Sequence, residues 1–275
     1  MKIFYSIEDF LQSRLHVKSF IPTMGNLHEG HLSLVRKAKD LSSNTCVSIY
    51  VNKAQFDKED DFKSYPKTLE DDIKKLQNLN VDYLLIPEEP EIEKFSKPLI
   101  IKNEPTHLTK DLCGKYRKGH FLAVMDIVHR FFQIVRPENV FFGMKDYQQL
   151  MVIKELIKSQ NYEVNLIESE TIRSNEGLAL SSRNKNLSEE QLQYASEIYK
   201  SLKYAKHLIK QGCEIDEINT RIYQYFEEFP IEVEYFSIRD LKTLQQLYDS
   251  DLIALIAVYI GKVRLIDNII IESTP

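Results

Sequence analysis

Short apolar runs alternate with amphipathic segments along the first half of the chain. The segments 31–41 and 68–79 carry apolar residues at helical spacing and predict helices. The apolar, partly β-branched runs around them predict strands at residues 19–22, 46–51, 81–86, 139–142 and 164–167. Strands that alternate with helices predict a parallel sheet that is covered by helices.

The segment 121–135 is apolar on nearly every helical face. A helix of this kind must be buried all round, so the sequence favours a central core helix. A helix that is partly buried by a second subunit remains the alternative. His129 and Arg130 lie within this apolar segment, and we expect both to be structural.

The pattern changes after residue 184. Ser188 and Gln191 form a capping box, which predicts a helix that runs from there to about residue 210. A second helix is expected at about residues 215–228, followed by strands at 233–238, 252–260 and 265–271. We therefore predict a separate small α/β domain, with residues 1–171 in the first domain and 172–275 in the second.

Composition narrows the classes of partner and location. The chain of 275 residues has a net charge of −5, which argues against a nucleic-acid partner because phosphate backbones bind net-basic surfaces. Charged residues follow the N-terminal methionine too early for a signal peptide, and no apolar run approaches a membrane span. Cys46, Cys113 and Cys213 show no metal or redox spacing, so we expect reduced thiols and a cytoplasmic protein without membrane contact.

Two histidines, His28 and His31, stand one helical turn apart where the first apolar run gives way to a helix. Free backbone N–H groups and the helix dipole favour an anion at such an N-terminus. The imidazoles add directional donors, and Gly30 lets a phosphate approach the backbone. We predict a polyphosphate site, against the alternative of a surface helix with incidental histidines.

A second anion site is predicted after the strand at 139–142, where Gly143 and Lys145 precede a helix. A solvated surface lysine is the alternative for Lys145. The polar loop 172–184 contains Ser181, Ser182 and Arg183, whose hydroxyl and guanidinium donors suit a triphosphate. Taken alone, this loop would be read as an ordinary polar loop.

Candidate groups for a small acceptor substrate follow the strand at 46–51. Asn52 and Gln55 are neutral amides at a carboxyl edge and suit a substrate that carries hydroxyl and carboxylate groups. A basic stretch adds Arg117 and His120 as candidates for binding an anionic substrate.

The ordered set of these motifs resembles one family, the pantothenate synthetases (pantoate–β-alanine ligases). The first motif alone is shared by many nucleotidyl-transferring enzymes, whereas the ordered set is specific to this family. The similarity extends over nearly the whole chain, through residues 22–31, 51–56, 65–69, 119–121, 142–149, 177–184, 238–240 and 264–268.

The resemblance implies a Rossmann-like, parallel-sheet nucleotidyltransferase domain followed by a small α/β C-terminal domain that acts as a lid. It implies the condensation of D-pantoate with β-alanine, in which ATP is converted to AMP and pyrophosphate through a pantoyl-adenylate. ATP would enter with Mg²⁺, whose protein ligands the sequence leaves unknown; Asp71 and Asp72 lie near a region of the family that has been linked to metal. The resemblance also implies a homodimer.

Site roles carry over residue by residue. His28, His31 and Lys145 would be catalytic, with His31 as the proton donor. Pantoate would contact Gln55 and Gln149, and β-alanine would contact Gln55. ATP would contact Met24, Gly25, Asn26, Leu27, His28, Glu29, Gly30, His31, Gly143, Met144, Lys145, Asp146, Ile172, Leu180, Ser181, Ser182 and Arg183.

Four positions depart from the family pattern, and none is a residue assigned to the chemistry itself. They are Lys53, Lys118, Ala123 and Met144. The alternatives are another nucleotidylyltransferase with the same His-x-Gly-His core, or a non-catalytic nucleotide-binding regulator. A regulator of this kind should have lost His28, His31 or Lys145, and a tRNA synthetase fragment is disfavoured by the acidic composition.

Overall fold

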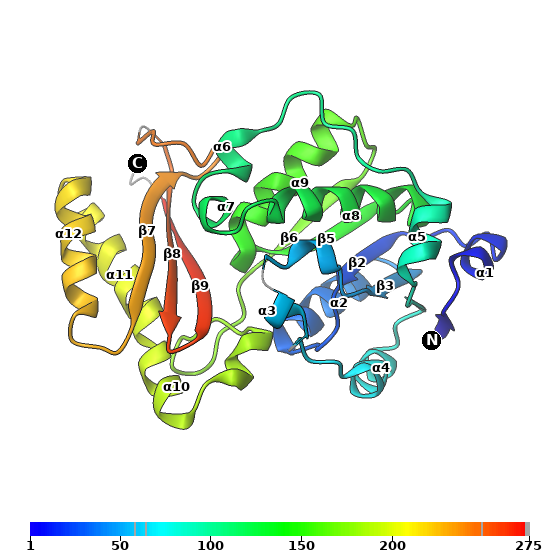
Figure 1. Cartoon of the computed structure of the whole chain (residues 1–275), viewed down its shortest axis with the longest axis horizontal. Helices are drawn as coiled ribbons and strands as arrows, with labels where there is room; N and C mark the ends of the chain where they lie inside the picture. The colour runs from blue at the N-terminus through cyan, green and yellow to red at the C-terminus, as the bar shows by residue number, and fades with distance from the viewer. Residues whose placement is uncertain (58, 64, 249, 273–275) are drawn as a thin grey trace. The chain divides into compact units, whose positions relative to one another are not determined.

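The computed structural model describes residues 1–57, 59–63, 65–248 and 250–272, and the chain divides into two compact units (Figure 1). The first unit contains residues 1–144 and 149–170, and the second contains residues 145–148 and 171–275. The short stretch 145–148 thus groups with the second unit although it follows a strand of the first. The boundary after residue 171 and the role of the second domain as a lid stay predictions.

The first unit is built on a six-stranded sheet in which every pair of neighbouring strands is parallel. This confirms the fold class that the alternating pattern predicted. The strands lie in the order β1-β4-β3-β2-β5-β6. Their bounds are Lys2–Phe4 (β1), Ser19–Thr23 (β2), Thr45–Ile49 (β3), Tyr83–Leu85 (β4), Asn139–Gly143 (β5) and Asn165–Ser169 (β6).

The sheet has a topological switch point between β2 and β5, which pair in register from Ser19 with Asn139. From β2 the chain adds β3 and β4 on one side, and it later adds β5 and β6 on the other. Ligands of open α/β sheets bind beyond the carboxyl ends of the strands at such a point. Both predicted anion sites follow these two central strands, one after Thr23 and the other after Gly143.

Helices connect these strands, as the parallel order requires. The long ones are α2 (Glu29–Leu41), α4 (Leu69–Asn78), α8 (His120–Val135) and α9 (Tyr147–Ser159). The short ones are α1 (Ile7–Gln12), η1 (Lys53–Gln55), α3 (Glu59–Lys63), α5 (Glu89–Phe95), α6 (Thr106–Thr109), α7 (Cys113–Tyr116) and η2 (Met144–Asp146). Helix α2 begins two residues earlier than we expected, which makes His28 its N-cap.

The two faces of the sheet are covered by different helices, because successive strand residues point to opposite sides. Ile21 of β2 packs in one core with Val35 of α2 and Leu76 of α4. The neighbouring Phe20 faces the other way and meets Phe131 of α8, with ring centroids 5.7 Å apart. Both sides of β2 are therefore buried, which fixes the position of the loop that follows it.

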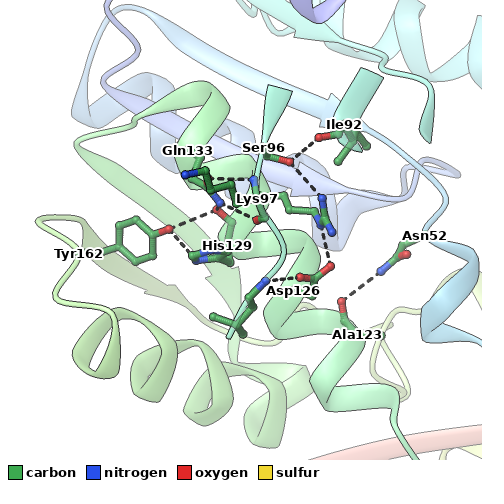
Figure 2. A network of polar contacts seen from close by, with 11 residues as sticks. Asn52, Ile92, Ser96, Lys97, Ala123, Asp126, His129, Gln133 and Tyr162 are labelled. Atoms are coloured by element: carbon green, nitrogen blue, oxygen red, sulfur yellow. Dashed lines mark hydrogen bonds and ion pairs between the residues drawn. The ribbon is translucent and has the colours of Figure 1, made fainter. Parts of the chain in front are cut away.

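The expectation that α8 is buried on every face was wrong for one side. Asp126 and Gln133 lie on a half-buried face, which the segment 96–99 partly covers (Figure 2). The Gln133 amide accepts from Lys97 N and donates to Lys97 O, and Asp126 Oδ1 accepts from Leu99 N. These polar side chains of an otherwise apolar helix thus bind the segment 96–99. They satisfy hydrogen-bonding groups of its backbone.

The second unit has a three-stranded antiparallel sheet in the order β7-β8-β9. Its strands are Glu232–Asp240 (β7), Leu252–Ile260 (β8) and Val263–Ile271 (β9), and its helices are η3 (Ser182–Asn186), α10 (Glu189–Ala195), α11 (Glu197–Lys210) and α12 (Ile215–Phe226). The capping box of Ser188 and Gln191 is present. The single helix expected to about residue 210 is instead broken at Ser196, whose hydroxyl donates to the Gln193 carbonyl.

Candidate functional site

The loop between β2 and α2 turns through two left-handed residues, Gly25 (φ +78°) and Asn26 (φ +50°). A Cβ atom at Gly25 would lie 3.1 Å from a methyl group of Ile49 and 3.2 Å from an oxygen of Asp72. Both the backbone angle and the close approach require glycine there. The sharp turn brings the chain directly from the carboxyl end of β2 into the N-terminus of α2.

Two side chains of α4 hold this loop. Asp72 is 1% exposed, and its two oxygens accept from Asn26 N and Leu27 N, each at 2.8 Å. Thr68 also donates to Asp72, at 3.1 Å, instead of capping the helix with its hydroxyl. Lys75 Nζ donates to the Leu27 carbonyl at 2.8 Å. These bonds satisfy the buried carboxylate and make Asp72 the side chain that fixes the loop.

His28 and His31 form the start of α2. His28 Nδ1 accepts from Gly30 N at 3.1 Å, and His31 Nδ1 accepts from His28 N at 3.4 Å. A backbone N–H can only donate, so each Nδ1 is an acceptor and each Nε2 carries the proton. The two rings lie side by side, with centroids 4.1 Å apart. A Cβ at Gly30 would lie 2.8 Å from the His28 ring, so this glycine also makes room for the cap.

The amides that follow β3 are buried. Asn52 is 7% exposed and Gln55 is 8% exposed, at the start and within η1. Asn52 Nδ2 donates to the Ala123 carbonyl of α8 at 3.2 Å (Figure 2). Because that contact uses the backbone of residue 123, the departure from the family pattern at Ala123 does not remove it.

The sequence suggests Arg117 and His120 as ligands of an anionic substrate. In the structure both side chains donate hydrogen bonds to the backbone of Gln55. His120 Nδ1 donates to the Gln55 carbonyl at 2.8 Å, and Arg117 Nη2 donates to the same oxygen at 3.2 Å. Arg117 Nη1 also donates to His120 Nε2 at 3.0 Å, so these bonds require a neutral imidazole with its proton on Nδ1. The sequence missed this arrangement because the partner is a backbone oxygen 62 to 65 residues away.

Lys145 belongs to the second unit. Its side chain is 18% exposed, and Nζ lies 3.6 Å from Asp146 Oδ1. Its carbonyl accepts from the side-chain amide of Asn268 at 2.9 Å. The predicted site residues therefore divide between the units. Residues 24–31, Gln55, Gly143, Met144 and Gln149 lie in the first unit, whereas Lys145, Asp146, Ile172, Leu180, Ser181, Ser182 and Arg183 lie in the second.

The loop 172–184 is held by backbone pairing and by one of its two arginines. Leu180 N donates to the Ile172 carbonyl at 2.9 Å, and Ser181 caps η3 by accepting from Arg183 N. Arg173 instead forms a buried ion pair with Asp267 through two bonds of 2.6 and 2.9 Å. Burial raises the pKa of Asp267, against the opposite pull of Arg173 and of the Asn268 N–H.

The remaining candidate chemistry is limited. Among the described residues, no group of three or more His, Cys, Asp or Glu side chains is arranged to hold a metal ion. No disulfide joins Cys46, Cys113 and Cys213, and burial raises the pKa of the Cys46 thiol well above its usual range. None of the helices in the described ranges has the length and apolar character needed to cross a membrane.

Comparisons with known proteins identify the family of this chain. The profile of the pantoate-beta-alanine ligase family matches residues 4–270. A pantothenate synthetase of Neisseria meningitidis serogroup A is 40% identical over 277 residues, which cover 99% of each chain. One from Thermodesulfovibrio yellowstonii is 39% identical over 259 residues, which cover 92% of this chain and 91% of the relative.

Solved structures give the same result. A pantothenate synthetase from Thermus thermophilus superposes with a TM-score of 0.91 at 32% identity, covering 99% of this chain and 100% of that one. A pantoate-beta-alanine ligase from Francisella tularensis, complexed with beta-gamma ATP and beta-alanine, superposes with a TM-score of 0.80 at 35% identity, covering 100% of this chain and 99% of that one. With its parallel sheet, its switch-point loop and these matches along nearly its whole length, the chain belongs to the pantoate-beta-alanine ligase family.

Proposed function

We propose that this ligase condenses D-pantoate with β-alanine and ATP to give pantothenate, AMP and pyrophosphate through a pantoyl-adenylate. The main observation that supports the binding and activation of ATP is the geometry at the N-terminus of α2. There a buried carboxylate holds the loop, and both histidines carry their protons on Nε2. Membership of the family, and the nucleotide and β-alanine bound to the Francisella tularensis relative, support the identity of the substrates.

In the first step, a carboxylate oxygen of pantoate attacks the α-phosphorus of ATP, and pyrophosphate leaves. A carboxylate is a poor acylating agent, and the mixed anhydride with AMP makes it reactive. The protein's work is positioning and charge neutralisation. We propose that His28 and His31 stabilise the pentavalent α-phosphorus of the transition state, with His31 as the proton donor. Lys145 would bind the phosphates. Residues 24–31, 143–146, Ile172 and 180–183 would bind the nucleotide.

In the second step, the unprotonated amine of β-alanine attacks the acyl carbonyl of the adenylate, the amide bond forms, and AMP leaves. Gln55 and Gln149 would hold pantoate, and Gln55 would also meet β-alanine. The rigid mounting of Gln55 by Arg117 and His120 supports this assignment, since a fixed backbone lets one amide keep both reactants aligned.

Mg²⁺ would enter as part of the ATP substrate and would neutralise negative charge on its phosphates, as this ion usually does in nucleotide sites. Within the described part of the chain, no group of three or more His, Cys, Asp or Glu side chains is arranged to hold a metal ion, and Asp72 accepts hydrogen bonds from the loop. A metal held mainly by phosphate fits that donor set.

The direct test is AMP release from ATP and Mg²⁺, with pantoate and β-alanine each present or omitted. We expect pyrophosphate but no AMP with pantoate alone, because AMP stays in the adenylate, and continuous AMP release, matched by pantothenate, only with both. If the pair gives no turnover, the acceptor assignment is wrong; a phosphorylated acceptor that releases pyrophosphate would instead identify a different nucleotidylyltransferase. No nucleotide chemistry with any acceptor would favour the non-catalytic regulator.

Gln55→Ala should raise the KM for pantoate by about 10- to 100-fold, the value of one or two hydrogen bonds to a charged substrate. The carbonyl that Arg117 and His120 hold remains in the variant, so the loop should keep its place. Steady-state kinetics with varied pantoate measure the effect, and Gln77→Ala, at an exposed position near the end of α4, is the matched control. A normal pantoate KM in folded Gln55→Ala would rule out the role.

We also propose a homodimer in the cytoplasm, where ATP is available and thiols stay reduced. The half-buried face of α8 supports association, since the segment 96–99 covers it only partly. Light scattering at micromolar concentration should give twice the chain mass of 32.3 kDa. A mass of one chain at that concentration would contradict the dimer without affecting the proposed reaction.

A further inference from the structure

Asp267 and Asn268 are consecutive polar residues within the largely apolar strand β9, and both are buried. Asp267 is 4% exposed and Asn268 is 6% exposed. Successive residues of a strand point to opposite faces, so the two side chains address different neighbours. Buried polar groups are costly unless they are bonded, which makes the partners of this pair informative.

Asp267 fixes the loop that begins at Ile172. Arg173 bonds both oxygens of Asp267, and it also donates to the carbonyls of Gly177 at 3.1 Å and Asn268 at 3.2 Å. Its guanidinium lies 3.7 Å from the centroid of the Tyr199 ring. The start of the loop and its turn at Gly177 are thereby tied to β9, directly before the residues 180–183 that we propose for the triphosphate.

Asn268 fixes the second nucleotide segment. Its side-chain amide donates to the Lys145 carbonyl at 2.9 Å across 123 residues of sequence. Two residues further along, the Tyr147 hydroxyl donates to the Leu241 carbonyl at 2.9 Å. These two bonds connect residues 145–148 to the second unit, with which this stretch groups.

We propose that Asn268 is a positioning residue for Lys145. Asn268 and the Arg173–Asp267 pair together attach two segments to β9, the one at Lys145 and the loop that begins at Ile172. These are the segments through which the second unit would bind ATP. The inference rests on the proposed function, because it assumes that Lys145 binds the phosphates. In this proposal Asn268 touches no substrate. It affects the nucleotide only through its hydrogen bond to the backbone of Lys145.

The test measures ATP affinity, with Mg²⁺ present, by isothermal titration calorimetry. Asn268→Ala should raise the dissociation constant of ATP by about tenfold, the value of one buried hydrogen bond. Asn268→Asp should do at least the same, since it replaces the donor with an acceptor that faces the Lys145 carbonyl. Ser201→Ala is the matched control, because it removes a buried side-chain bond of the same unit, from Ser201 Oγ to the Ile198 carbonyl.

A second arm separates positioning from general loosening of the unit. In a Lys145→Met background, Asn268→Ala should weaken ATP binding by less than about twofold, because two residues that act as one are not additive. Equal losses in both backgrounds, or an unchanged dissociation constant in folded Asn268→Ala, would overturn the proposal. Titration requires no turnover, so failure of the pantoate and β-alanine assay would leave this outcome readable.

Discussion

His31→Ala is expected to lower the rate of pantoyl-adenylate formation by about 10²- to 10³-fold, the usual cost of removing one preorganised donor from a developing charge. His31 Nδ1 is engaged with the His28 backbone, so the Nε2 proton is the group that the imidazole presents. Pantoate-dependent exchange of labelled pyrophosphate into ATP measures this step in isolation from amide formation.

His31 also contributes to the cap of α2, so the helix start needs its own control. His31→Gln keeps an acceptor at the third helical position, where glutamine is a natural capping-box residue, but lacks the imidazole. We expect it to melt like the wild type and still to lose exchange. His207→Ala, at an exposed position of α11, controls for the loss of an unrelated imidazole. Normal exchange in folded His31→Ala would remove the residue from the mechanism.

The sequence predicted the part of the fold that periodicity encodes. The alternation of strands and helices predicted the parallel sheet. Gly25, shortly after β2, marked a tight turn, and its backbone there is left-handed. The anion site, which stays a prediction, rests on local features, since His28, Gly30 and His31 lie within four residues of one another. Local patterns of this kind are readable because the partners in each contact are neighbours in the chain.

Contacts between distant residues could not be predicted in the same way. Nothing in the sequence near Arg117 and His120 shows that both bond the carbonyl of Gln55, since a backbone oxygen has no sequence signature. The half-buried face of α8 was missed for a similar reason. Its Asp126 and Gln133 bond the backbone of the segment 96–99, whose amino-acid identities hardly matter to the bonds.

The grouping of Lys145 with the second unit also lay beyond the sequence. A lysine two residues after the end of a strand is read as part of that strand's domain, as the expected boundary after residue 171 shows. The signal that could have been used is Asp267-Asn268, because two polar residues in the middle of an apolar strand need buried partners. The partners, Arg173 for Asp267 and the Lys145 carbonyl for Asn268, can be identified only from the folded structure.

Lys145→Met should lower kcat/KM for ATP in adenylate formation by about 10²- to 10³-fold, as expected for the loss of a charge that stabilises the departing pyrophosphate. Methionine keeps the length and apolar stem of lysine, and the Asn268 bond is to the backbone, so the segment should stay in place. Pantoate-dependent pyrophosphate exchange at varied ATP measures the effect, with Lys158→Met at an exposed position of α9 as the control.

The division between kcat and KM tells which role Lys145 has. A lysine that binds ATP and the transition state equally raises KM and leaves kcat unchanged, whereas one that acts on the departing charge lowers kcat. We expect a loss in kcat as well as a rise in KM, because Lys145 would hold the phosphates of bound ATP and attack at the α-phosphorus shifts further negative charge onto the β- and γ-phosphates as the bond breaks. A full-rate Lys145→Met enzyme would remove Lys145 from the mechanism.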